Sequence, residues 1–257
     1  MTMFRACRSW NRRQLLLVLT VFAVVAPAAP AQVLTSFAEL TAVPPSGSTN
    51  RLEFTVTLPD ILGGISSSDT SDVSGTLDAE LAYDLVGTTP VFNGLTLTGG
   101  RVFLTDMTLD FLLGLVTITT QGMSGVPGTP APPGAVVAGT FNGSSHQIAF
   151  DQGTIVSSGL VVDTRDLSVE PSISTGSGTG TIEILGTTLN GPTATYDVAL
   201  TLPVSSIDTD IVNNITVELE TSGSVRAEGS FTVVIPEPAT GAMIAGCLMM
   251  SLRPRRR

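Results

Sequence analysis

The sequence predicts an all-β fold for the body of this 257-residue chain, residues 32–233, either an antiparallel β-sandwich or a flattened barrel. First, apolar residues in the body alternate with polar ones at a period of two, which is typical of strands with one buried face. Second, clusters of Gly, Ser, Asn and Pro interrupt these segments at short intervals, as turns do. Third, no stretch of the body shows a convincing helical period.

The alternation marks four segments most clearly. In residues 52–58, Leu, Phe, Val and Leu share one face while Glu and Thr occupy the other. Residues 77–83, 196–202 and 215–219 repeat this pattern. Residues 103–113 come nearest to a helix, but their Thr and Asp content favours a strand. These segments are therefore predicted to be half-buried antiparallel strands.

Turn signals lie at residues 44–47, 63–64 and 190–192, each rich in Pro, Gly, Ser or Asn. The Pro/Gly-rich run 125–134 is predicted to be a long exposed loop within one domain, with an interdomain linker as the alternative. Residues 52–59 also resemble residues 196–203, and a Ser-rich acidic loop is expected after each (67–70 and 206–209). This weak internal duplication reflects either two similar hairpins or chance similarity among Thr-rich strands.

The N-terminus has the features of a secretory signal peptide. Four arginines precede a strongly apolar stretch, residues 15–25, and small residues follow it. Ala29 and Ala31 fit the signal peptidase pocket, so cleavage is predicted after Ala31. Arg12 and Arg13 also resemble part of a twin-arginine signal, although the very apolar stretch suits the general secretory route better.

The C-terminal segment, residues 234–257, combines three features in a fixed order. The triplet Pro236-Glu237-Pro238 comes first, and the apolar run 239–252 follows it. The chain then ends in an arginine cluster, Arg253, Arg255, Arg256 and Arg257. A helix over 239–252 would be about 21 Å long, shorter than the hydrocarbon core of about 30 Å. The arginines resist crossing, so they would hold this short hydrophobic helix with the body facing outward.

These C-terminal features resemble the PEP-CTERM sorting signal of bacterial surface and exopolysaccharide-associated proteins. The resemblance covers residues 235–257 and implies processing by exosortase, a membrane protease-transpeptidase. The Thr/Gly-rich strands of the body look broadly like those of uncharacterised proteins with this signal. The tail departs from the usual pattern in being rich in Met, and an ordinary tail anchor is the alternative interpretation.

Charge and cysteine content limit what the body can do. Removing both ends leaves four arginines against 21 carboxylates, a net charge of −17. Such a surface repels nucleic acids and anionic lipid headgroups, which excludes DNA or RNA as a partner. Both cysteines, Cys7 and Cys247, lie in the terminal segments, so the body can form neither a disulfide nor a thiol nucleophile.

Catalytic side chains are scarce in the body. It has no lysine and a single histidine, His146, which is expected to be partly buried on a strand. A Gly-x-Ser-x-Gly motif is absent, and a metal site with several His or Cys ligands cannot be assembled. Carboxylates two residues apart, Asp78 with Glu80 and Glu218 with Glu220, are expected to form solvated strand faces. The body is therefore predicted not to be an enzyme, and no cofactor is expected.

Calcium is the one ion for which the body offers weak candidates. Asp69, Asp72, Asp208 and Asp210 are expected to lie in turns, where oxygen ligands suit Ca²⁺. Ordinary Asx-turns are the competing interpretation. Stacking of sugars is disfavoured because the only tryptophan lies in the signal peptide and the body's tyrosines and phenylalanines are expected in the core.

Taken together, the sequence predicts an exported, non-enzymatic protein of the bacterial cell surface or of the extracellular matrix of a biofilm. Its expected partners are signal peptidase and exosortase during export, the membrane through a transient C-terminal helix, and exopolysaccharide. One alternative is a secreted module that binds calcium, a glycan or an apolar ligand. The other is a secreted hydrolase that uses two carboxylates.

Overall fold

The structure is a computed structural model that describes residues 33–59, 64–130, 132–160, 162–212 and 215–235. The side chains of residues 208, 210–212 and 215 are not described. The chain divides into two units, Met1–Val33 and Leu34–Arg257, and only Val33 of the first is described. The predicted signal peptide 1–31 and C-terminal helix 239–252 therefore lie outside the described residues.

The described residues of the second unit form 14 strands and two short 3-10 helices. This confirms the predicted all-β antiparallel class. No helix of the described residues is long and apolar enough to span a membrane. The elements are β1 (Leu34–Ala42), β2 (Arg51–Leu58), β3 (Ile65–Val86), β4 (Thr89–Leu104), β5 (Met107–Phe111), η1 (Leu112–Gly114), β6 (Val116–Gly128), β7 (Gly134–Val137), β8 (Thr140–Asn142), η2 (Gly143–Ser145), β9 (Gln147–Gly159), β10 (Asp163–Asp166), β11 (Ser172–Thr175), β12 (Thr179–Asn190), β13 (Thr193–Val212) and β14 (Ile215–Val234).

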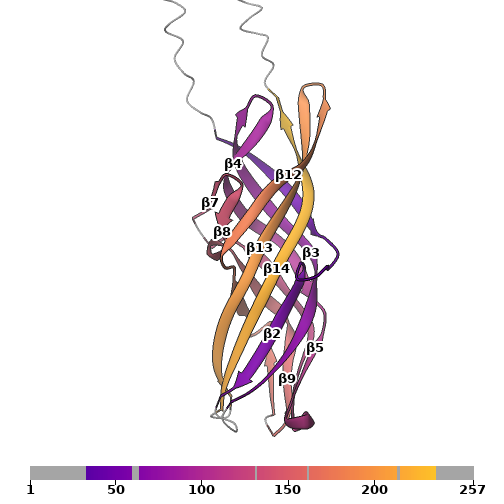
Figure 1. The fold of residues 1–257 in the computed structure, drawn as a ribbon, viewed down its shortest axis with the longest axis vertical. Helices are drawn as coiled ribbons and strands as arrows, with labels where there is room; N and C mark the ends of the chain where they lie inside the picture. Colours follow the sequence, from indigo (N-terminus) through magenta and orange to yellow (C-terminus); the bar gives the residue numbers. More distant parts are fainter. Residues whose placement is uncertain (1–32, 60–63, 131, 161, 213–214, 236–257) are drawn as a thin grey trace, which may run out of the picture. The chain divides into compact units, whose positions relative to one another are not determined.

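All strands belong to one antiparallel sheet that closes on itself as a ring. The ring runs β4–β7–β8–β12–β13–β14–β1–β3, and pairing between β3 and β4 closes it. The strands β6, β9, β10, β11, β5 and β2 extend the sheet beyond this ring. β13 and β14 pair over their full length, from Thr193 opposite Val234 to Val212 opposite Ile215. Figure 1 shows these two strands side by side in orange and yellow.

Alternation along the ring strands buries one face of the sheet in a large apolar cluster. Leu40, Leu77 and Leu200 are fully buried within it, and Tyr83, Tyr196 and Phe92 pack around Phe231. A second, smaller cluster joins β2, β5 and β6. Burial of these side chains must stabilise the fold, because the body cannot form a disulfide.

The expectation of core positions for all body phenylalanines is wrong at two of them. Phe37 and Phe103 are largely exposed, whereas the other six are buried. Both exposed rings belong to strands with one solvated face, Phe37 opposite Glu80 and Phe103 opposite Ser74. Their position in the two-residue period therefore determines their exposure more than their hydrophobicity does.

Two predicted loop regions prove to be strand. Residues 67–70 belong to β3 and residues 206–209 to β13, so the Ser-rich acidic loops expected there are not loops. The predicted loop 125–134 begins only after Gly128, because residues 125–128 pair with β9. A Cβ atom at Gly125 would lie 2.9 Å from the Ala149 carbonyl oxygen. That glycine therefore permits close strand packing and does not mark a turn.

Candidate functional site

The predicted targeting residues lie outside the described part of the chain. These are Ala29 and Ala31 at the N-terminus, and Pro236, Glu237, Pro238 and the four terminal arginines. The structure does describe where the segment before the triplet is held. β14 ends at Val234, and the Ile235 amide donates to the Pro192 carbonyl at 2.7 Å. The triplet Pro236-Glu237-Pro238 thus follows directly in sequence after a residue attached to the sheet.

The first pair of calcium candidates, Asp69 and Asp72, lies in strand β3, which corrects the expectation of a turn. Asp69 accepts from the Thr70 amide at 2.8 Å and from the Thr108 amide at 3.0 Å. Asp72 pairs with Arg51, with 2.9 Å between Nε and Oδ1. The polar run forms a strand because its residues pair one by one with β2. Both carboxylates are therefore engaged by the protein itself.

The second pair, Asp208 and Asp210, also lies in a strand, and this corrects the same expectation. Their backbones stand opposite Leu219 and Val217 in the β13–β14 ladder, while their side chains are not described. Across the described residues, no group of three or more His, Cys, Asp or Glu side chains could hold a metal ion. The candidates are also divided between two strands, β3 and β13, that do not pair with each other.

The carboxylate pairs of the sequence also lie on strands. Asp78 and Glu80 are half-exposed on β3, and Glu218 and Glu220 are exposed on β14. Asp78 stands directly opposite Glu39 of β1. Like charges on adjacent strands disfavour each other, and their exposure to solvent makes this arrangement tolerable. The geometry is that of the solvated strand faces predicted from the alternation.

His146 differs from its predicted position on a half-buried strand. It lies between η2 and β9 and is fully buried. Its Nδ1 is 2.7 Å from the Thr129 hydroxyl, and its ring meets Phe141 edge-on at 5.0 Å. Among the residues that the structure describes, the Nε2 atom has no hydrogen-bond partner, and it faces Gly134, where a Cβ atom would lie 2.7 Å away. The imidazole therefore contacts three chain segments, at Thr129, Gly134 and Phe141.

Burial lowers the pKa of His146 from 6.5 to about 4, so the ring is neutral at pH 7. A neutral imidazole could serve as a base, but this one has no exposed surface at which to meet a substrate. Its Thr129 partner already accepts from the Leu97 amide at 2.9 Å. The arrangement is suited to holding the β6–β7 connection in place.

Arg101 forms the best-aligned ion pair of the described residues. It donates to both carboxylate oxygens of Asp151, at 2.7 and 3.1 Å, and to the Ser124 hydroxyl at 3.0 Å. The hydrogen bond from Arg101 lowers the pKa of Asp151, and the same bond raises the pKa of Arg101. Bidentate geometry of this kind fixes orientation as well as charge. The pair ties β4 to β9 across β6.

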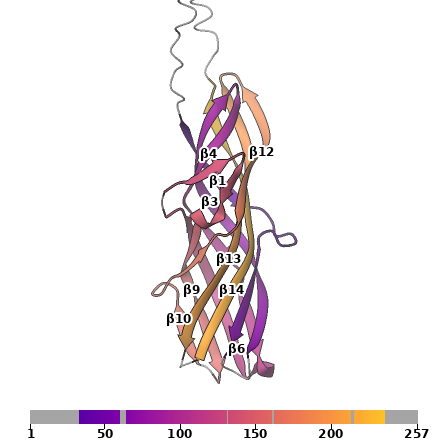
Figure 2. The same cartoon turned by 60° about the vertical axis from the view of Figure 1, so that its left-hand side comes forward.

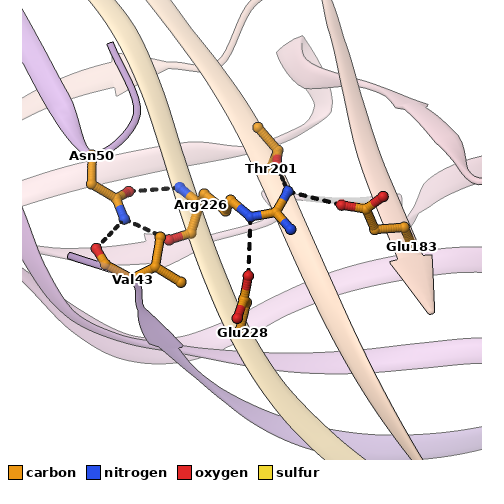
Figure 3. A network of polar contacts seen from close by, with 6 residues as sticks. All are labelled: Val43, Asn50, Glu183, Thr201, Arg226 and Glu228. Carbon is orange, nitrogen blue, oxygen red and sulfur yellow. Dashed lines mark hydrogen bonds and ion pairs between the residues drawn. The ribbon is translucent and has the colours of Figure 1, made fainter. Parts of the chain in front are cut away.

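A second polar network surrounds Arg226 on β14 (Figure 3). Its guanidinium donates to Glu183 at 2.8 Å, to Glu228 at 3.1 Å and to the Thr201 hydroxyl at 3.4 Å. These carboxylates raise the pKa of Arg226, with the Glu183 hydrogen bond as the largest cause. All three side chains of the ion pairs are partly exposed, so each pair contributes at most about 1 kcal/mol.

The backbone of Arg226 is held by a residue that the sequence analysis did not single out, Asn50. The Asn50 side-chain amide donates to the Val43 carbonyl at 2.6 Å and to the Arg226 carbonyl at 2.7 Å. Its Oδ1 accepts from the Arg226 amide at 2.6 Å (Figure 3). Asn50 is fully buried and has a φ of 52°, a region that asparagine tolerates better than most residues. Its place at the end of a Pro/Gly/Ser/Thr run was the available sequence signal.

Each of the four arginines in the described residues is paired with a carboxylate: Arg51, Arg101, Arg165 and Arg226. Every arginine of the body therefore has a carboxylate as its partner. The remaining carboxylates give the surface its acidic character. The described surface therefore lacks an unpaired cation with which to attract an acidic partner.

Comparison with models of protein families and with curated proteins finds no match for this chain. Comparison with solved structures aligns it with InvG, the open-gate secretin of the Salmonella SPI-1 type III secretion injectisome. The sequences are 9% identical over 94% of this chain and 72% of that chain, with a TM-score of 0.12. A likeness at that score carries no argument about fold or function.

Proposed function

We propose that this protein is exported and sorted to the bacterial cell surface or the extracellular matrix, where its β body acts without catalysis. Signal peptidase would remove residues 1–31, and an exosortase-type enzyme would process the C-terminal segment near Pro236–Pro238. The observation that carries the proposal is the triplet Pro236-Glu237-Pro238, followed by an apolar run and four arginines at the end of the chain.

The position of the triplet supports recognition by a membrane protease. Its prolines disfavour helix, so the segment between Ile235 and Ala239 would stay extended. Four residues of extended chain reach about 14 Å at most. Ile235 is hydrogen-bonded to Pro192 at the end of the sheet, so the triplet follows in sequence directly after a residue that the folded body holds.

The chemistry of the body supports a role in display and not in catalysis. Its only histidine is buried, and its arginines are engaged in ion pairs. A net charge of −17 favours solubility in a hydrated matrix and repulsion between neighbouring copies. Exopolysaccharide is the proposed neighbour, contacted through exposed Ser and Thr hydroxyls and not through stacked aromatic rings.

The proposal is tested by changing the triplet in the natural host. The variant Pro236→Ala/Glu237→Ala/Pro238→Ala keeps the apolar run and the arginines, so it should still reach the membrane. We expect this variant to accumulate in the membrane fraction with its tail uncut, while the unchanged protein appears at the surface or in the medium. Cell fractionation with one antibody against the β body and a second against a C-terminal peptide measures both populations, because only the uncut form binds the second antibody.

A matched control alters the same residue types in exposed positions of the body, Pro44→Ala/Pro45→Ala/Glu53→Ala. This control should be sorted like the unchanged protein. Loss of the C-terminal epitope from the triplet variant at the normal rate would contradict recognition of Pro236–Pro238.

A further inference from the structure

The end of the sheet opposite Val234 carries an exposed group of aliphatic side chains on two adjacent connections. Leu113 and Leu115 lie between β5 and β6, and Leu160 and Val162 lie between β9 and β10. Leu113 is fully exposed, and the exposed fractions of the other three lie between 57% and 72%. These four residues are called the apolar tip below.

Hydrogen bonding holds the two connections of the apolar tip together. The Leu160 amide donates to the Leu115 carbonyl at 3.0 Å, and Gly159 stands opposite Val116 in the β6–β9 ladder. A Cβ atom at Gly159 would lie 2.0 Å from the Leu115 carbonyl oxygen. Glycine is therefore required at 159 for this close approach. The four aliphatic side chains consequently form one local group on neighbouring turns.

The backbone of the first connection is strained. Leu112 and Leu113 both have left-handed φ angles, 53° and 58°. Leucine rarely adopts this region because the Cβ atom comes too close to the backbone, so each of these two residues lowers the stability of the fold. A Gly or Asn would adopt the turn more readily. Leu113 is therefore unfavourable in two respects, because its backbone conformation is strained and its apolar side chain is exposed to solvent.

The hairpin turns at the other end of the sheet contain only Gly, Thr and Pro, although Val86 and Leu189 beside these turns are exposed. β3 and β4 are joined through Gly87-Thr88, and β12 and β13 through Gly191-Pro192. Both views of the fold show η1, the short coil that contains Leu113, at the end of the sheet away from these hairpins (Figure 1 and Figure 2).

The size and charge of the apolar tip indicate what covers it. A stable protein–protein interface buries about 800 Å² per partner. Four aliphatic side chains offer on the order of 100 Å² each, which is too little for a dimer of two tips. A lipid bilayer needs no complementary shape. No arginine lies in residues 111–116 or 159–163, and Asp110 and Asp163 flank the tip, so anionic headgroups would be repelled.

We propose that Leu113, Leu115, Leu160 and Val162 insert into the interface of a zwitterionic lipid bilayer. The tip and Ile235 lie at the two opposite ends of β14 (Ile215–Val234), because the cluster that contains Phe111 and Val116, beside the tip, packs against Val217 near the start of that strand. At about 3.4 Å per residue, those ends lie about 65 Å apart along the strands.

Tryptophan fluorescence tests the proposal, because the body contains no tryptophan. The full chain carrying Trp10→Phe receives one new reporter, Leu113→Trp or Leu160→Trp, and is mixed with phosphatidylcholine vesicles that contain lipids brominated in the acyl chains. Val137→Trp, at an exposed site on β7, is the matched control. We expect quenching of both tip reporters to exceed that of the control at least twofold, and to fall when phosphatidylglycerol replaces phosphatidylcholine.

Two tip positions keep the test independent of any one variant's folding, and circular dichroism verifies the sheet in each. Equal quenching at the tip and at Val137→Trp would overturn the proposal, as would absence of quenching at both tip positions. A blue-shifted tip reporter in a dimer without vesicles, seen by sedimentation, would show that a second copy covers the tip and would also overturn it.

Discussion

Replacing Asn50 by alanine is expected to lower the free energy of unfolding by about 4 kcal/mol. Asn50 lies where β1 leaves β14 and β3 passes from pairing β1 to pairing β2. Its side chain satisfies the Arg226 amide and carbonyl and the Val43 carbonyl, all in a fully buried position. An unpaired buried polar group costs about 1–3 kcal/mol, and alanine would add the strain of a left-handed φ.

Thermal and urea unfolding measure this loss, which corresponds to a decrease of about 10 °C in Tm for a domain of this size. Asn50→Gly separates the two causes, since glycine keeps the backbone conformation and removes only the side-chain hydrogen bonds. Asn190→Ala, at an exposed position, serves as the control and should change stability by less than about 0.5 kcal/mol. A loss in Asn50→Ala no greater than in this control would refute the assigned role.

Acid is expected to remove about 3 kcal/mol of stability through His146 alone as the pH falls from 6.5 to 4. The folded state keeps this buried imidazole neutral down to about pH 4, whereas the unfolded chain binds a proton near pH 6.5. Between these values the unfolded state holds more protons, so stability is full above pH 6.5 and decreases as the pH falls toward 4. Protonation would place a charged N–H at Nε2, which has no hydrogen-bond partner in the described part of the chain.

The measurement is the free energy of unfolding in urea at intervals between pH 7 and pH 4. His146→Asn retains a side-chain acceptor near Thr129 but cannot titrate in this range, so its stability should change far less over the same interval. Asp151, whose pKa Arg101 lowers, contributes a separate loss only below its ordinary pKa of 3.8. Parallel pH profiles for His146→Asn and the unchanged protein would show that His146 does not cause the decrease.

Much of the fold could be predicted because burial on a strand follows a simple period. The alternation in residues 52–58 and 196–202 correctly placed Leu52, Phe54, Val198 and Leu202 in the core. It failed where both faces of a strand are polar. Residues 67–72 contain only Ser, Thr and Asp, so nothing apolar marks them as a strand, and their pairing with β2 determines their structure.

The residues that hold the ring together were beyond prediction because their partners are distant in sequence. Asn50 and Arg226 are 176 positions apart, and only the closed sheet brings them together. His146 was recognised as structural, but its full burial depends on Thr129, Gly134 and Phe141 from three other segments. Gly125 was interpreted as part of a loop, because a sequence does not distinguish a glycine needed for close packing from one needed for a turn.

The most direct test of the proposed sorting is the intact mass of the protein recovered from the surface and medium of its natural host. We predict a mass that lacks residues 1–31 and also lacks the apolar run and arginines that follow Pro236–Pro238. A mass that extends to Arg257 would contradict sorting and would identify the protein as a tail-anchored envelope protein whose body faces outward.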